Sequence, residues 1–244
     1  MFFVPRQKVL IIGGSAEARA LAARLKGNAA VMLPAPERLA QNWPVPVVPA
    51  LLSQEALMAR LGYGVRVLVD ASHPCDRESS QIAYEVARAR DIPLFRIERA
   101  AWRPTRQDHW SFPRDEAAAA RLVAPGERVL LATGRQSLSR LKGLSRAYVY
   151  ARQISDHDDR FPLPRGRFLK GSAPFTVAQE VALMRRLRID WIILRNAGGT
   201  GGWPKLEAAR KLGVQVAMLP RPALPPARVV GDVSSALKQV VECL

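Results

Sequence analysis

Short apolar segments alternate with segments of helical periodicity along most of the chain. The predicted strands cover residues 8–12, 29–33, 65–70, 93–97, 128–132, 147–151, 190–195 and 214–219. The predicted helices cover residues 16–25, 54–61, 77–90, 116–122, 176–187, 204–212 and 234–243, with a further short one after residue 136. This alternation is typical of parallel strands joined by crossover helices. The chain is therefore predicted to be an α/β protein.

The pattern stops once and starts again, which indicates two lobes. Residues 98–114 are rich in Trp, Pro and Arg and show no period, so we interpret them as the seam. With 244 residues, two lobes of about 100 to 150 residues each are reasonable. We predict an N-terminal lobe over 1–100 and a C-terminal lobe over 101–244. Each is expected to be a small parallel sheet flanked by helices.

Composition excludes several classes of protein. Charged residues or Pro interrupt every apolar run before the roughly 18 residues that a membrane helix needs. The N-terminus runs directly into the first strand without a cationic start, so no targeting segment is predicted. Cys75 and Cys243 have no spacing of a metal or disulfide framework. We expect a cytoplasmic protein with no membrane partner and no metal.

The net charge of +16 requires an explanation. A positive chain attracts nucleic acid, anionic membranes or small polyanions through the same long-range field. The arginines are dispersed, and no dense basic run or aromatic ladder suited to stacked bases occurs. We therefore favour small polyanionic ligands, and a nucleic-acid-binding protein remains the alternative.

In open parallel sheets, ligands bind beyond the carboxyl ends of the strands, so the loops there are the candidate sites. The first loop carries Gly13, Gly14 and Ser15 before a helix that contains Arg19. A loop that opens a helix suits phosphate, although paired glycines also serve ordinary turns. No acidic residue ends the second strand, and Arg38 lies a little further on, which favours NADP over NAD.

The second loop, residues 70–74, combines an acid with a histidine. Asp70 and Ser72 either cap the following helix or contact a ligand. His73 either makes a structural hydrogen bond or serves the chemistry, as ligand contact or proton donor.

Two further loops follow strands of the C-terminal lobe. The third offers Thr133, Gly134, Arg135 and Gln136, a set suited to phosphate or carboxylate. The fourth, residues 196–205, is rich in glycine and ends with a lysine in the first turn of a helix, where the helix dipole disfavours a cation. It indicates a negatively charged ligand; a flexible surface loop is the alternative. The candidate residues of this loop are Asn196, Gly198, Gly199 and Lys205.

No nucleophile elbow, zinc-peptidase motif or P-loop lysine motif occurs, whereas hydride transfer requires none of these. Taken together, the loops resemble those of the precorrin-6A reductases, called CobK in aerobic and CbiJ in anaerobic organisms. The matching segments, in family order, are IIGGSAEAR at 11–19, DASHP at 70–74, RIERAAW at 96–102, ATGRQ at 132–136, SAPF at 172–175, NAGG at 196–199 and KLEAARKLG at 205–213. Ser15 and Cys75 depart from the family's usual Thr and Phe, and neither change touches an expected reacting group.

The resemblance implies NADPH-dependent reduction of one double bond of the precorrin-6A macrocycle to give precorrin-6B. It also implies two Rossmann-like lobes with a ligand cleft between the lobes. A polycarboxylate tetrapyrrole and a phosphate-bearing cofactor would explain the arginines. The expected cofactor-binding residues are Gly13, Gly14, Ser15, Arg19, Thr133, Gly134, Arg135, Asn196, Gly198, Gly199 and Lys205. The expected substrate-binding residues are Ser72, His73, Arg135 and Gln136, with His73 as the candidate proton donor.

Three questions stay open at this level. The loop chemistry alone also fits an NADP-dependent reductase or epimerase of another substrate. Both lobes carry glycine loops, so the sequence does not decide which one dominates cofactor binding. It does not decide whether the substrate carries cobalt or which face of the macrocycle receives hydride; a monomer is the working expectation.

Overall fold

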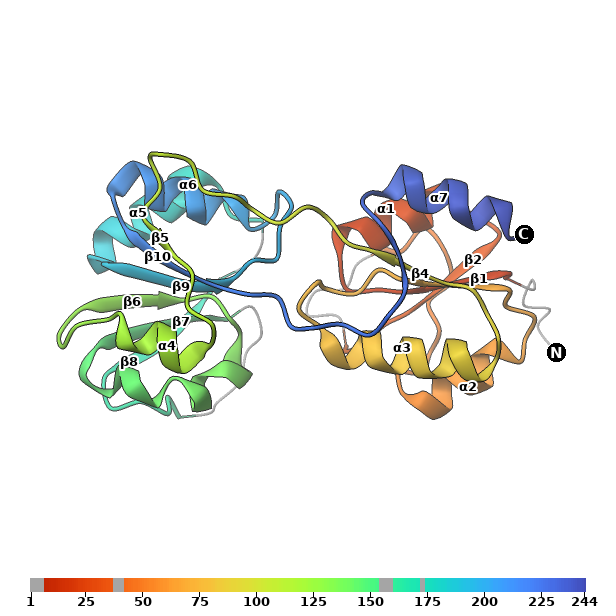
Figure 1. Ribbon diagram of the computed structural model, residues 1–244, viewed down its shortest axis with the longest axis horizontal. Helices are drawn as coiled ribbons and strands as arrows, with labels where there is room; N and C mark the ends of the chain where they lie inside the picture. The colour runs from red at the N-terminus through yellow and green to blue at the C-terminus, as the bar shows by residue number, and fades with distance from the viewer. Residues whose placement is uncertain (1–6, 37–41, 154–159, 172–173) are drawn as a thin grey trace. The chain divides into compact units, whose positions relative to one another are not determined.

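The computed structural model describes residues 7–36, 42–153, 160–171 and 174–244, and it divides into two compact units. Unit 1 comprises residues 1–100 and 222–244, and unit 2 comprises 101–221. Each unit contains one sheet, and every strand pairing within the two sheets is parallel (Figure 1). The predicted α/β class with two Rossmann-like units is confirmed. No helix among the described residues is long and apolar enough to cross a membrane.

Unit 1 has a five-stranded sheet in the order β11-β4-β3-β1-β2. Its elements are β1 (Val9–Ile12), α1 (Ala16–Arg24), β2 (Ala29–Met32), α2 (Gln54–Leu61), β3 (Val67–Asp70), α3 (Arg77–Ala89), β4 (Leu94–Ile97), β11 (Arg228–Val230) and α7 (Val233–Glu242). This is the flavodoxin-like order of doubly wound folds. The predicted strand at residues 65–70 corresponds to β3, which is the middle strand of this sheet.

Alternation along the strands gives the sheet of unit 1 two covered faces. Val9 and Ile11 pack in one core with α1 and α7, whereas Leu10 and Ile12 pack in the other with α2 and α3. In Figure 1, α1 and α7 accordingly lie above this sheet and α2 and α3 below it. Successive residues of a strand point to opposite faces, so a strand covered on both sides must be apolar throughout.

Unit 2 has a six-stranded sheet in the order β5-β10-β9-β6-β7-β8. Its elements are β5 (Trp110–Ser111), α4 (Glu116–Arg121), β6 (Arg128–Leu131), the 3₁₀ helices η1 (Arg135–Arg140) and η2 (Lys142–Arg146), β7 (Tyr148–Gln153), β8 (Gly166–Lys170), α5 (Val177–Leu187), β9 (Trp191–Arg195), α6 (Trp203–Leu212) and β10 (Gln215–Leu219). From β6 onward the order is 3-2-1-4-5, the Rossmann arrangement, with β5 added at one edge. Helices α5 and α6 cover one face, and α4 with η1 and η2 covers the other.

The structure changes the predicted domain limits. Residues 222–244 were expected in the C-terminal lobe, yet they pack with unit 1. The reason is topological, because β11 pairs with β4 and α7 packs beside α1. Unit 2 is thus inserted between two segments of unit 1.

Three strands escaped the sequence prediction: β5, β8 and β11. Each forms an edge of its sheet, β5 within the expected seam and β8 within a stretch for which no strand was predicted. Their residues are partly or fully exposed, so they lack the apolar run that identifies the inner strands. A capping box begins α5, since Thr176 accepts a hydrogen bond from Gln179 N at 3.2 Å and the Gln179 side chain accepts one from Thr176 N at 2.9 Å.

Candidate functional site

The four candidate loops fall in pairs at the two topological switch points. In unit 1, the strand order reverses between β1 and β3, which the first and second loops follow. In unit 2, it reverses between β6 and β9, which the third and fourth loops follow. A switch point is where helices leave the sheet toward opposite faces and open a crevice for a ligand. Each unit therefore contains one candidate site formed by two of the expected loops.

The first loop is shaped by its glycines. Gly14 has φ of 121°, which L-residues with a side chain rarely adopt. Gly13 lies so close to Leu33 that an added Cβ would come within 2.9 Å of the Leu33 Cδ2 atom. The Ser15 hydroxyl caps α1 by accepting from Ala18 N at 3.1 Å, and it donates to the Ala71 carbonyl at 2.7 Å. Ser15 thus ties the first loop to the second.

Two charged residues of α1 are engaged within unit 1. The Arg19 guanidinium lies 4.2 Å from the ring centre of Trp43 and donates to the Asn42 carbonyl at 3.2 Å. Glu17 accepts two hydrogen bonds from Arg99, at 2.9 and 2.8 Å. Burial raises the pKa of Glu17, but its own backbone N–H and Arg99 outweigh burial and hold that pKa below its ordinary value. The Glu17 carboxylate in the first turn therefore already interacts favourably with the positive end of the α1 helix dipole.

Asp70 is the centre of a buried hydrogen-bond network. It is 1% exposed and accepts from Ser72 N at 3.2 Å, Ser72 Oγ at 2.6 Å, Ser80 Oγ at 2.6 Å and Arg96 Nε at 2.9 Å. One interpretation of the sequence was that Asp70 and Ser72 cap α3. Neither does so, because the N-cap is Asp76, which accepts a hydrogen bond from Ser79 N at 3.1 Å. The Ser72 hydroxyl is therefore committed to Asp70 and holds the second loop in place.

Arg96 links this network to the returning C-terminal segment. It is 5% exposed, and its Nη1 donates to the Pro225 carbonyl at 2.8 Å. Its Nη2 is buried without a hydrogen-bond partner among the described residues. The Asp70–Arg96 pair thus joins the second loop, α3 and the segment that leads into β11.

His73 is exposed at the end of the second loop. Its Nδ1 accepts a hydrogen bond from Cys75 N at 3.2 Å, so the neutral ring carries its hydrogen on Nε2. The structural hydrogen bond considered for this residue is present. His73 therefore places an exposed imidazole at the switch point of unit 1.

The third loop is closed by short polar contacts. Gly134 has φ of 83°, and the Ser137 hydroxyl contacts Thr133 Oγ1 and donates to the Gly134 carbonyl at 2.7 Å. Arg135 and Gln136 form the start of η1, and their side chains lie outside the described part of the structure. The same is true of Arg38 and of residues 172 and 173 in the SAPF segment.

Asn196 links the fourth loop to Trp102 and Arg221, which lie near the first and last residues of unit 2. Its side-chain amide accepts a hydrogen bond from Trp102 N at 2.8 Å and donates one to Trp102 O at 2.9 Å. The Trp102 indole donates to the Gly199 carbonyl at 2.7 Å. Arg221 donates to the carbonyls of Asn196 at 2.7 Å and Ala197 at 3.2 Å. The Asn196 side chain therefore already has hydrogen-bond partners within the protein.

The glycine run leads into a helix without a side-chain cap. Gly198 and Gly199 have φ of 70° and 71°, and an added Cβ on Gly202 would come within 2.5 Å of the Trp102 ring. Among the α-helices that the structure describes, α6 alone lacks a side-chain N-cap, and its first turn holds no acid. The Trp203 N–H donates to the Thr200 carbonyl at 3.2 Å and Pro204 has no N–H, so backbone rather than a side chain caps this helix end.

Lys205 adds a cation to this helix end. Its Nζ donates to the Gly202 carbonyl at 3.3 Å. Burial lowers the pKa of Lys205, the carboxylate of Glu180 opposes this shift, and Arg152 adds to it. Arg152 and Glu180 form a bidentate ion pair, with side chains only 8% and 1% exposed. Because that pair is neutral overall, Lys205 leaves one surplus positive charge beside the glycine loop.

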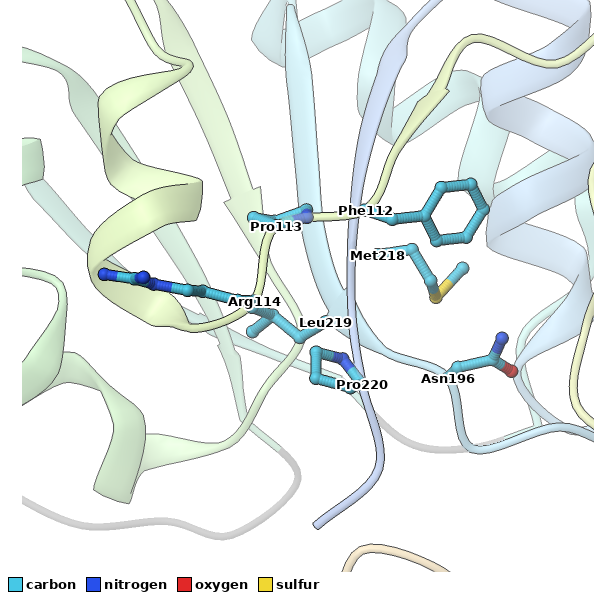
Figure 2. Close-up of a pocket in the computed structure, with 7 residues that line it drawn as sticks. All are labelled: Phe112, Pro113, Arg114, Asn196, Met218, Leu219 and Pro220. Carbon is cyan, nitrogen blue, oxygen red and sulfur yellow. The ribbon is translucent and has the colours of Figure 1, made fainter.

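A shallow hollow of about 190 Å³ lies at the carboxyl ends of β5 and β10. Figure 2 shows its lining residues, Phe112, Pro113, Arg114, Asn196, Met218, Leu219 and Pro220, with the guanidinium of Arg114 extending away from the other six. Ligand pockets usually measure about 300 to 1,000 Å³. This mostly apolar hollow can therefore hold only part of a ligand beside the fourth loop.

Several residues of the site were missed from the sequence. Arg96, Arg99, Arg152 and Arg221 each form a contact that shapes a loop. Arginine is so frequent in this chain that no local signal separates them from exposed ones. Only the RIERAAW segment, which contains Arg96, Arg99 and Trp102, gave a hint.

The fold and its loops define a two-unit, doubly wound α/β protein whose glycine-bearing loops gather where such folds bind dinucleotides. Residues 8–241 match the family model described as "Precorrin-6x reductase CbiJ/CobK". The chain therefore belongs to the CbiJ/CobK family of precorrin-6x reductases.

Individual relatives agree over nearly the full length. The chain is 36% identical to a precorrin-6A reductase of Rhodococcus erythropolis, covering 96% of this chain and 97% of that protein. It is 32% identical to a precorrin-6A reductase of Rhodobacter capsulatus, covering 89% of each. It is also similar to a solved structure described as "CobK precorrin-6A reductase", with a TM-score of 0.89, 28% identity, and coverage of 97% of this chain and 96% of that one.

Proposed function

We propose that this protein is an NADPH-dependent precorrin-6A reductase, which reduces one double bond of the macrocycle to give precorrin-6B. The observation that carries the proposal is full-length membership of the family, together with the pairing of all four family loops at the two switch points. We further propose that it works in the cytoplasm as a monomer.

The described residues fit a dinucleotide in unit 2. Its sheet has the Rossmann order, α6 begins without a side-chain N-cap or an acid in its first turn, and Lys205 supplies a surplus cation there. In unit 1, by contrast, Ser15 caps α1 and Glu17 occupies its first turn. We therefore assign the cofactor's phosphates to Gly198, Gly199 and Lys205, with Thr133, Gly134 and Arg135 completing the site across β6.

Unit 1 carries the other two candidate loops. We propose Gly13, Gly14 and Ser15 as further cofactor contacts, with Arg19 of α1 contributing positive charge. Ser72, His73, Arg135 and Gln136 are proposed to contact the substrate. The carboxylates of a tetrapyrrole match the positive charge of the chain. Asn196 supports the cofactor loop from behind, because its amide is bonded to Trp102.

Reduction of a double bond requires a hydride and a proton. Bound NADPH supplies the hydride, and the protein orients the reactants and controls access of water. The His73 ring is exposed at the end of the second loop, and we propose its protonated form as the proton donor. If His73→Ala retained wild-type turnover and an unchanged pH profile, this role would be lost.

The test is calorimetric titration with NADPH and NADH, followed by anaerobic turnover of precorrin-6A monitored by absorbance. We expect NADPH to bind more tightly than NADH and substrate to be consumed only with the reduced cofactor. Lys205→Met should weaken NADPH binding by about tenfold if it removes one charge-assisted phosphate contact. Arg77→Met, on an exposed residue of α3, is the matched control and should change nothing. Absence of NADPH binding at millimolar concentration would refute the proposal.

A further inference from the structure

The amino ends of the strands of unit 2 carry a group of arginines that the proposed reaction does not use. We call Arg128, Arg146, Tyr148, Arg165 and Arg167 the amino-end patch. Arg128 begins β6, Tyr148 begins β7, and Arg165 and Arg167 flank the first residue of β8. A strand of four residues is about 13 Å long, so β6 separates this patch from the loops at its other end.

The patch is contiguous. The guanidiniums of Arg128 and Arg165 lie 5.3 and 5.5 Å from the ring centre of Tyr148. Arg167 lies 5.8 Å from the ring of Tyr150, whose hydroxyl accepts from Arg128 at 3.1 Å. Arg146 and Arg165 both line an open hollow of about 490 Å³, together with Pro125, Gly126, Ser145 and Pro164.

Its positive charge is not neutralised locally. Among the described residues, Arg146, Arg165 and Arg167 are exposed and have no carboxylate partner. In the described part of the chain, Glu127 and Asp190 lie at this end, and neither carboxylate pairs with a guanidinium of the patch. Glu127 accepts from Ala124 N at 2.6 Å and from the Trp191 indole at 3.0 Å, and Asp190 accepts from Arg128 N at 2.8 Å.

We propose that the amino-end patch is a docking surface for an acidic surface of a partner protein. Arginine and tyrosine are the residues enriched at the energetic centres of protein interfaces, and guanidinium forms bidentate bonds with carboxylate. Contacts with Tyr148 and Tyr150 restrict three of these guanidiniums before binding, which lowers the entropy cost of association.

The same features disfavour nucleic acid as the occupant. Single strands require successive aromatic faces for stacked bases, whereas this patch has one exposed ring, already in contact with two guanidiniums. Charge complementarity therefore favours carboxylates presented by a folded protein.

The experiment measures binding of a short, fluorescein-labelled peptide rich in Asp and Glu by fluorescence anisotropy, using the full chain. The test variant is Arg165→Glu with Arg167→Glu. The matched control is Arg77→Glu with Arg88→Glu on α3 of unit 1, exposed residues whose reversal changes the net charge equally. We expect the test variant to bind the peptide at least about tenfold more weakly and the control to lose less than about twofold.

Three results would overturn the proposal. Equal losses in the two variants would show that the field of the whole chain binds the peptide. No loss of binding in the test variant would exclude the patch. Arg146→Glu serves as a second test variant in case the double variant is misfolded. Tighter binding of labelled DNA than of peptide at equal salt, lost in the test variant alone, would assign the patch to nucleic acid. Circular dichroism confirms folding independently of the proposed reductase activity.

Discussion

Replacing Asp70 by Asn tests whether the buried network beneath the second loop holds unit 1 together. The change keeps the size of the side chain but leaves the Arg96 cation, 5% exposed, without its counter-ion. Breaking a buried ion pair on one side costs about 3–5 kcal/mol. The stability of a typical domain is about 5–15 kcal/mol, so unit 1 should lose a large part of its margin.

The Arg96→Met variant leaves Asp70 charged and should cost a similar amount. Combining the two substitutions removes both charges, so the double variant should be less destabilised than the sum of the single variants, by up to about 3 kcal/mol. Urea denaturation gives the free energies, and hydrogen exchange of β1, β3 and β4 peptides shows that unit 1 is the unit affected.

The exposed pair of Glu207 and Lys211 provides the control, with side chains 34% and 58% exposed. Glu207→Gln should change stability by less than about 0.5 kcal/mol. The reasoning fails if Asp70→Asn is as mild as this control, or if the effects of Asp70→Asn and Arg96→Met simply add.

Three further predictions concern loop residues. Gly14→Ala should cost about 1–3 kcal/mol through backbone strain, since φ is 121° and an added Cβ meets nothing closer than 3.5 Å; an unchanged urea midpoint would contradict this. Lys205 has a lowered pKa, so the folded state binds its proton less firmly than the unfolded chain does. The stability of the protein should therefore rise with pH toward the ordinary lysine pKa of about 10.4. Lys205→Met should raise the stability near neutral pH and abolish that rise, as measured by pH-dependent unfolding. Glu17 also has a lowered pKa, so the stability it contributes is present above its ordinary value of about 4.3 and is lost as the pH falls through the lowered one; Glu17→Gln should flatten this part of the acid unfolding curve, and an unchanged curve would exclude the role of Arg99.

The sequence predicted the inner strands well because burial on both faces demands a specific composition. The segment that became β3 is apolar from Val67 to Val69, as expected for an inner strand that is covered on both faces. The edge strand β8 contains Gly, Arg and Lys with exposed residues, so its composition does not distinguish it from a loop. Its pairing depends on β7, a contact that no local pattern encodes.

The candidate site was predicted at the level of loops rather than side chains. The four loops could be located because the apolar pattern alone shows where the strands end. In the structure all four lie at switch points. The hydrogen bonds between the Asn196 side chain and the Trp102 backbone could not be predicted, since the two residues are far apart in sequence. The same holds for Arg152 and Glu180, whose pairing decides the charge around Lys205.

The inserted position of unit 2 has a consequence for how the chain folds during synthesis. By the time residue 221 has left the ribosome, every strand of unit 2 has been made, whereas unit 1 still lacks β11 and α7. The face of β1 that α7 helps to cover therefore stays open to solvent until α7 has been made. In multidomain proteins the N-terminal domain usually folds first. Here unit 1, which holds the earlier strands, closes after unit 2, and a nascent chain that stops before α7 would expose its apolar sheet to chaperones or to aggregation.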